Sequence, residues 1–206
     1  MDKLYFLAVF VGASTFFACG SSDANSSGGS SVSEVDGTWL QACEADDGTS
    51  NKGSNVFGGG RSSITQTYYS DANCTTEAWS IVMTSTYTLG AAVTIPAGAK
   101  EVNSTVSKAV VTMKDQNYVD LFNGQIQGAP ATCGGGFVKD VPKELNATTC
   151  ASDANFKKLF TDTFGIYKID GTKLYSGNCG DSGTDTDCTS ATKRPKTLKT
   201  DPLTKV

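Results

Sequence analysis

The chain has 206 residues, of which 18% are charged and 22 are glycine, and its formal net charge is −4. It contains no histidine, so any catalytic or transition-metal site would have to do without the commonest general base and ligand. The acidic balance argues against nucleic acid as a partner, because phosphate recognition needs a concentrated basic surface. Abundant Gly, Ser and Thr, with apolar residues in short runs, favour strands and turns over a helical bundle.

The chain starts with an apolar run, residues 4–17, which is too short to span a bilayer. Small residues and Cys19 follow it, and this pattern predicts a signal peptide over residues 1–18. The segment Phe16-Phe17-Ala18-Cys19 resembles the lipobox of bacterial lipoproteins, which implies that Cys19 is acylated, for example with palmitate, and anchors the protein to a membrane. No Asp directly follows the cysteine, which by the lipoprotein sorting rule implies the outer membrane of the cell envelope. An ordinary cleaved signal peptide is the alternative.

Three further segments complete the expected organisation. Residues 19–34 are mostly Ser, Gly and Asn, a composition typical of a flexible tether. Residues 35–192 are long enough for one domain with one core. Residues 193–206 form a short basic tail, which we expect to be solvated or to flank a strand.

Alternating apolar and polar residues predict a series of strands in the domain. In chain order these are residues 37–43, 63–69, 78–89, 105–113, 118–125 and 165–169, with residues 173–175 as a shorter candidate. Asp170-Gly171 predicts a hairpin between the last two strands. One short helix is expected where Ser152 or Asp153 can cap a segment whose residues Phe156, Leu159 and Phe160 share one face.

The expected fold is therefore all-β, a single antiparallel β-barrel of about eight strands with one short helix. A β-sandwich is the alternative. Gly37-Thr38-Trp39 resembles the Gly-x-Trp opening of lipocalins and other calycin barrels, and residues 174–177 with Arg194-Pro195 resemble the ends of lipocalin-like bacterial lipoproteins. The resemblance implies that Trp39 closes the base of the barrel and that a basic residue from the last strand, with Arg194 as the candidate, packs over it.

The chain has seven cysteines, and removing the proposed anchor Cys19 leaves an even set of six. Six cysteines allow 15 connectivities, and the sequence does not choose among them. We expect neighbours to pair, as is common in exported domains with a modest core. The expected pairs are Cys43 with Cys74, Cys133 with Cys150, and Cys179 with Cys188.

Three motifs suggest chemistry that the sequence does not otherwise support. Gly180-Asp181-Ser182-Gly183 resembles the tetrad around the nucleophile of trypsin-like serine proteases, but no histidine is present to accept the serine proton. Asp181, Asp185 and Asp187 lack the EF-hand order, so a solvated loop is expected, with calcium as a minor alternative. Gly58-Gly59-Gly60 precedes a strand and predicts a flexible loop. We therefore expect no catalytic residue, metal or cofactor.

The function expected from the sequence is that of a membrane-anchored lipoprotein whose barrel binds a small apolar ligand or a surface protein partner through its open end. Tyr69, Tyr87 and Trp79, on the predicted strands, are weak candidates for lining the ligand site. The alternative is a structural, adhesin-like or protease-inhibitor-like surface lipoprotein with a filled core. A third hypothesis, hydrolysis by a serine or a carboxylate, lacks the residues that it needs, and we expect no enzyme.

Overall fold

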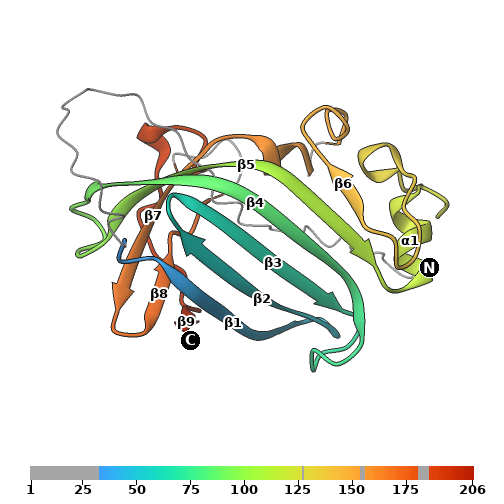
Figure 1. Cartoon of the computed structure of the whole chain (residues 1–206), viewed down its shortest axis with the longest axis horizontal. Coiled ribbons are helices and arrows are strands. Elements are labelled where there is room, and N and C mark those ends of the chain that lie inside the picture. The colour runs from blue at the N-terminus through green and yellow to red at the C-terminus, as the bar shows by residue number, and fades with distance from the viewer. Residues whose placement is uncertain (1–32, 127, 154–155, 181–185) are drawn as a thin grey trace.

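The computed structural model describes residues 33–126, 128–153, 156–180 and 186–206 (Figure 1). The predicted signal peptide, Cys19 and most of the tether lie outside the described residues, as do Asp181, Ser182 and Asp185. Within the described part of the chain, no helix combines the length and the apolar character needed to cross a bilayer.

Eight antiparallel strands form a closed barrel, which confirms the predicted fold (Figure 1). The strands follow one another around the ring in the order β1, β2, β3, β4, β5, β7, β8, β9, and β9 pairs with β1 to close it. Their bounds are β1 Gly37–Asp46, β2 Thr49–Gly58, β3 Arg61–Tyr69, β4 Glu77–Ala92, β5 Lys100–Met113, β7 Thr163–Asp170, β8 Lys173–Ser176 and β9 Leu203–Lys205. A further strand, β6 (Lys143–Leu145), pairs with the later part of β5 outside the ring.

Local sequence explains the tight turns between strands. The β1–β2 hairpin turns at Asp47 and Gly48, both with positive φ (42° and 84°), as a two-residue hairpin turn of type I′ requires. The predicted hairpin at Asp170-Gly171 is confirmed, because Asp170 on β7 faces Lys173 on β8.

The strand predicted over residues 118–125 is wrong, because the segment contains the helix α1 (Gln116–Phe122). Asp115 caps this helix by accepting a hydrogen bond from the backbone N–H of Asn117 at 2.8 Å. Val119 and Phe122, three residues apart, are buried on one helical face. The predicted short helix also forms, as the 3-10 helix η2 (Phe156–Phe160), and Asp153 accepts from the N–H of Phe156 at 3.0 Å.

Two strands of the ring were not predicted. β2 has a turn-like composition rich in Ser, Asn and Gly, which hides its alternation. β9 lies at residues 203–205, within the segment predicted as a tail, so the barrel extends beyond residue 192. The other short elements are the 3-10 helices η1 (Thr132–Gly134) and η3 (Ala191–Lys193).

The strands have unequal lengths, and this difference shapes the barrel. β4 and β5 have 16 and 14 residues, whereas β8 and β9 have only 4 and 3. β9 pairs with β1 only at Trp39 and Leu40. The second half of β1 therefore has a strand neighbour on the β2 side alone within the described residues, and the wall is incomplete there.

A compact cap, formed by α1, η1, β6 and η2, covers the start of β4 and the end of β5. Figure 1 shows α1 and β6 beside that part of β5, away from β7, β8 and β9. Phe122 is the centre of an aromatic cluster in this cap, with ring centroids 5.3 Å from Trp79, 5.4 Å from Phe137 and 5.9 Å from Phe156. The cap and the inner faces of β4 and β5 form the larger of the two hydrophobic cores.

The smaller core closes the base of the barrel around Trp39, which is 0% exposed. Its indole Nε1 donates to the carbonyl of Val35 at 2.7 Å. The basic residue over the indole ring is Lys205 of β9, with its Nζ 5.1 Å from the ring centroid. The expectation that Arg194 fills this place is wrong, because Arg194 lies over Phe164 instead and donates to the carbonyl of Gly165 at 2.7 Å.

All three predicted disulfides are confirmed. They join Cys43 to Cys74, Cys133 to Cys150, and Cys179 to Cys188. The first ties β1 to the β3–β4 loop, the second lies within the cap, and the third joins two cysteines nine positions apart in the sequence.

Candidate ligand-binding cavity

The interior of the barrel contains a cavity of about 590 Å³, and all eight strands of the ring contribute lining residues. This volume lies within the range of small-molecule sites. The cavity reaches the second half of β1, at Gln41, Glu44 and Asp46, where β9 no longer covers the wall. The short β8 and β9 strands thus leave the cavity a side on which it can open.

Apolar side chains line much of the cavity. They include Met83 of β4, Val106 of β5 and Leu174 of β8. These side chains belong to the two hydrophobic cores. They offer a ligand van der Waals and hydrophobic contact, beside the polar side chains of Ser104 and Thr163 on β5 and β7.

The strands β1, β2 and β3 contribute a group of polar side chains to the lining, next to the apolar Phe57 and Ile64. We call Gln41, Asn51, Gln66 and Tyr68 the polar wall; all four line the cavity. The strand register brings them together, because Gly53 faces both Gln41 and Gln66, and Asn51 faces Tyr68. Asn51 Oδ1 accepts hydrogen bonds from Gln41 Nε2 at 2.9 Å and from Gln66 Nε2 at 2.7 Å. Three amides from three strands are thus joined into one unit.

Glycine at position 53 makes this arrangement possible. A Cβ atom at Gly53 would lie 2.6 Å from Gln66 Oε1, 2.9 Å from the carbonyl oxygen of Thr65 and 3.1 Å from Gln41 Oε1. The first two distances are too short for real contacts and the third is tight, so a larger residue would displace the amides and the backbone at Thr65. Gly53 is therefore needed for close approach, not for an unusual backbone angle.

Several polar groups of this wall face the cavity without a protein partner. Among the described residues, the amide nitrogen of Asn51 and the hydroxyl of Tyr68 make no side-chain hydrogen bond. The Tyr68 ring stacks on Trp79, with centroids 4.0 Å apart, and burial raises the pKa of its hydroxyl well above the usual range. The hydroxyl therefore stays protonated and remains a hydrogen-bond donor at neutral pH.

Charge near the cavity is predominantly negative. Among its described lining residues, Glu44, Asp46 and Asp201 carry carboxylates and Lys199 carries the one ammonium group. Glu44 faces Asn51 across β1 and β2, next to the polar wall. An anionic group on a ligand would be repelled by this balance.

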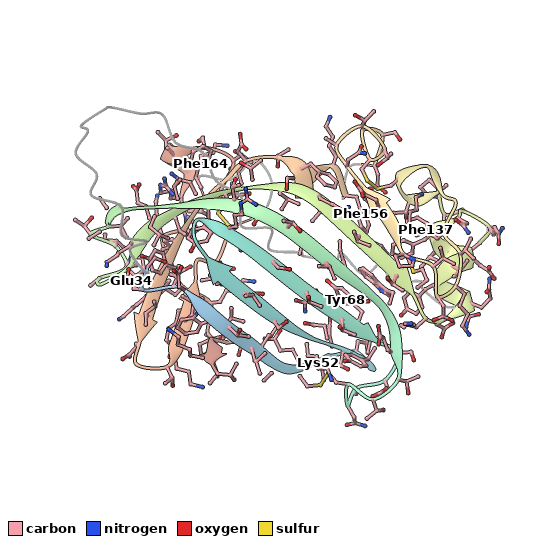
Figure 2. The ribbon with its side chains drawn as sticks, viewed as in Figure 1. Glu34, Lys52, Tyr68, Phe137, Phe156 and Phe164 are labelled. Atoms are coloured by element: carbon pink, nitrogen blue, oxygen red, sulfur yellow. A yellow bond between two sulfur atoms is a disulfide. The ribbon has the colours of Figure 1, made fainter. Side chains whose placement is uncertain are left out.

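At the base, the polar groups are paired. We call the segment 33–36, with Tyr87 and Tyr167, the base closure. The Tyr87 hydroxyl donates to Asp36 Oδ1 at 2.8 Å, and the Tyr167 hydroxyl donates to Glu34. Glu34 also forms an ion pair with Lys100 at 2.7 Å. Figure 2 labels Glu34 at this end of the barrel and Tyr68 on β3, toward the other end.

The carboxylates of the base closure have lowered pKa values. The hydrogen bond from Lys100, and then that from Tyr167, lowers the pKa of Glu34. Hydrogen bonds from Ser33 and Tyr87 lower the pKa of Asp36. Burial raises the pKa of both tyrosines. Both carboxylates are thus charged at neutral pH and hold the two hydroxyls in place.

Of the three residues predicted to line a ligand site, one is at the cavity. Tyr87 lines it from β4, at the base. Trp79 packs in the larger core between Tyr68 and Phe122. Tyr69 is buried beneath Lys52, whose Nζ lies 4.9 Å from its ring, and is absent from the lining. The structure does not bring the three together as one site.

Gln41, Asn51 and Gln66 were not among the predicted site residues. Gln41 lies two residues after Trp39, and this spacing on a strand places both side chains on the same face. Gln66 stands in the same relation to Tyr68. Strand alternation could have identified both, whereas Asn51 depends on β2, which was not predicted.

No cluster of three or more metal-ligating side chains occurs among the residues that the structure describes. No known family model and no curated protein sequence matches the chain. The cavity is therefore interpreted from its own residues.

Proposed function

We propose that this protein is a membrane-anchored barrel that binds a small amphipathic molecule in its interior. The observation that carries the proposal is the cavity of about 590 Å³, whose lining combines apolar side chains with the polar wall. A ligand with an apolar part and a hydrogen-bonding part would satisfy both. A wholly apolar ligand, as the sequence suggested, would leave the polar groups of Asn51 and Tyr68 unpaired at a cost of about 1–3 kcal/mol each.

Binding is favoured over a structural role with a filled core. Burying three amides inside a barrel costs free energy unless their groups are paired, and an apolar core would avoid that cost. Binding is also favoured over catalysis, because the chain has no histidine to act as a general base. At the cavity, Asp201 accepts a hydrogen bond from the hydroxyl of its neighbour Thr200 at 3.0 Å, but both residues are exposed to solvent, which does not favour activation of that hydroxyl.

The anchor is supported by the cysteine count. The three disulfides use six of the seven cysteines, so Cys19 is the one left for acylation. Together with the lipobox-like leader, this favours a lipoprotein of the bacterial cell envelope, at the outer membrane. The lipocalin-like Gly-x-Trp opening suits the same proposal, with the base closed by Trp39 and the ligand entering elsewhere.

Two experiments test these parts separately. The full chain with Cys19→Ser, exported by a bacterial host and purified without detergent, should release a small molecule into organic solvent that mass spectrometry detects in equimolar amount. If no small molecule is extracted and the protein also fails to bind amphipathic probes, the binding proposal is contradicted.

The second experiment tests the anchor. Labelled palmitate should be incorporated into the wild-type protein and not into Cys19→Ser. Equal labelling, or equal membrane association, of the two proteins would contradict the anchor.

A further inference from the structure

We infer that the polar wall selects ligands with a neutral, hydroxyl-rich head group, such as a sugar ring attached to an alkyl chain. This inference rests on the proposed function and names the class of ligand. It depends on which hydrogen-bonding groups face the cavity and on the charge around them.

The polar wall offers both donors and acceptors in a fixed arrangement. Asn51 Oδ1 is used by the two glutamine amides, which leaves the Asn51 Nδ2 donors, the Gln66 and Gln41 carbonyl oxygens and the Tyr68 hydroxyl for a ligand. A sugar hydroxyl both donates and accepts, so several vicinal hydroxyls can pair with such a mixed set. A carboxylate only accepts and a quaternary ammonium does neither, so each leaves part of the set unpaired.

The charge distribution favours the same head group over an anion. Glu44 faces Asn51 across the strand pair, so a carboxylate on the wall would lie near like charge. Asp46 and Asp201 add two further carboxylates to the lining against the single ammonium of Lys199. A neutral head group avoids this repulsion.

The cavity also provides a place for the alkyl chain. Met83, Val106 and Leu174 line it from β4, β5 and β8, outside the three strands that carry the amides. Each methylene of an alkyl chain that is buried there should tighten binding by about fourfold. A free sugar has no alkyl chain and cannot make this contact. The alkyl chain of the ligand therefore contributes affinity, and the polar wall contributes selectivity for the head group.

The test compares probes with the same octyl chain and different head groups, below their critical micelle concentrations. The full-length protein with Cys19→Ser is titrated with octyl glucoside or octyl galactoside, with octanoate and with octyltrimethylammonium. Free glucose and galactose, which lack the octyl group, are titrated in parallel. We expect at least one octyl glycoside to bind about tenfold or more tightly than either charged probe, and free sugar to bind far more weakly.

Variants identify the polar wall as the cause. Gln66→Leu should weaken the glycoside about tenfold and change the charged probes less than about threefold. Gly53→Ala, which displaces the same amides, should act in the same direction. Thr67→Val is the matched control, because Thr67 lies between Gln66 and Tyr68 on β3, so its side chain points to the outer face.

The possible failures are distinguishable. If a charged octyl probe binds as tightly as the glycosides, or if Gln66→Leu weakens all probes equally, the head-group inference is overturned and the binding proposal stands. If free sugar binds as tightly as its octyl glycoside, the amphipathic ligand is overturned. If mass spectrometry shows that the three disulfides are intact and no probe binds, the binding proposal fails as well.

Discussion

The base closure and the polar wall are both built from polar side chains inside or beside the same barrel, yet they are organised differently. At the base, the hydroxyls of Tyr87 and Tyr167 are each matched to a carboxylate of segment 33–36. In the polar wall, two amides share one acceptor, while Asn51 Nδ2 and the Tyr68 hydroxyl face the cavity. Paired polar groups favour a stable closure, whereas groups that keep hydrogen-bonding capacity at the cavity surface are available to a ligand.

The largest effect on stability is expected at the base. Trp39→Ala should lower the free energy of unfolding by about 3–5 kcal/mol, because it removes a fully buried indole and leaves a hole under Lys205. Urea unfolding followed by circular dichroism measures this change. Trp39→Phe should lose less, since it keeps most of the packing. A loss below about 1 kcal/mol for Trp39→Ala would mean that the base does not hold the barrel together.

The next largest effect on stability is expected at the disulfide that ties β1 to the β3–β4 loop. Replacing both Cys43 and Cys74 by Ala should lower the unfolding free energy by about 3–4 kcal/mol, because the bond closes a loop with a sequence separation of 31. The pair Cys179→Ala and Cys188→Ala is the control, with a separation of 9 and an expected loss of about 2–3 kcal/mol. A larger loss for the Cys179 and Cys188 pair than for the Cys43 and Cys74 pair would show that native contacts, and not loop closure, determine how much each disulfide stabilises the fold.

A smaller effect on stability is expected in the base closure, and it should depend on pH. The double variant Tyr87→Phe, Tyr167→Phe should lose about 1 kcal/mol at pH 7, since both carboxylates are solvent-exposed and each hydrogen bond contributes little. The folded pKa values of Glu34 and Asp36 lie below their ordinary values of 4.5 and 3.8. Their contribution is therefore complete above those values and is lost as the pH falls through the lowered folded values.

Urea unfolding between pH 7 and pH 2 measures this dependence. The difference between wild type and the double variant should be constant above about pH 5 and should shrink below about pH 4. A difference that stays the same down to pH 2 would mean that the tyrosines contribute through packing alone.

The smallest effect on stability is expected in the polar wall. Gln66→Leu and Asn51→Leu should each change the unfolding free energy by less than about 1 kcal/mol, because the lost hydrogen bonds are offset by burial of an apolar side chain. The same variants should weaken ligand binding. A loss of 2 kcal/mol or more would place the polar wall among the structural elements instead.

The sequence predicted the parts of the fold that local patterns define. Alternation and turn chemistry predict most strands of the barrel and the Asp170-Gly171 hairpin. The disulfide pairs agree with the expectation that sequence neighbours pair, although the sequence alone left 15 connectivities open. The helix at Gln116–Phe122 was missed because a short amphipathic helix with Val119 and Phe122 inside also fits a strand over a few residues.

The candidate site was harder to predict because it depends on register. Asn51 meets Gln41 and Gln66 only when β1, β2 and β3 pair as observed, and β2 carries a turn-like sequence. The choice of Lys205 over Arg194 at Trp39 likewise depends on β9, three residues long, which pairs with β1. Long-range pairings of this kind leave no local trace in the sequence.

The side-chain amide resonances of the polar wall offer the most direct measurement. In two-dimensional ¹H–¹⁵N spectra of the labelled full chain with Cys19→Ser, the NH₂ signals of Gln41, Asn51 and Gln66 report on the inside of the barrel. Titration with an octyl glycoside should shift these signals most, and leave the signals of Asn117 in α1 and Asn123 at its C-terminal end nearly unchanged. Shifts confined to the α1 region or to the outer face, with the three wall amides unmoved, would contradict an interior ligand site.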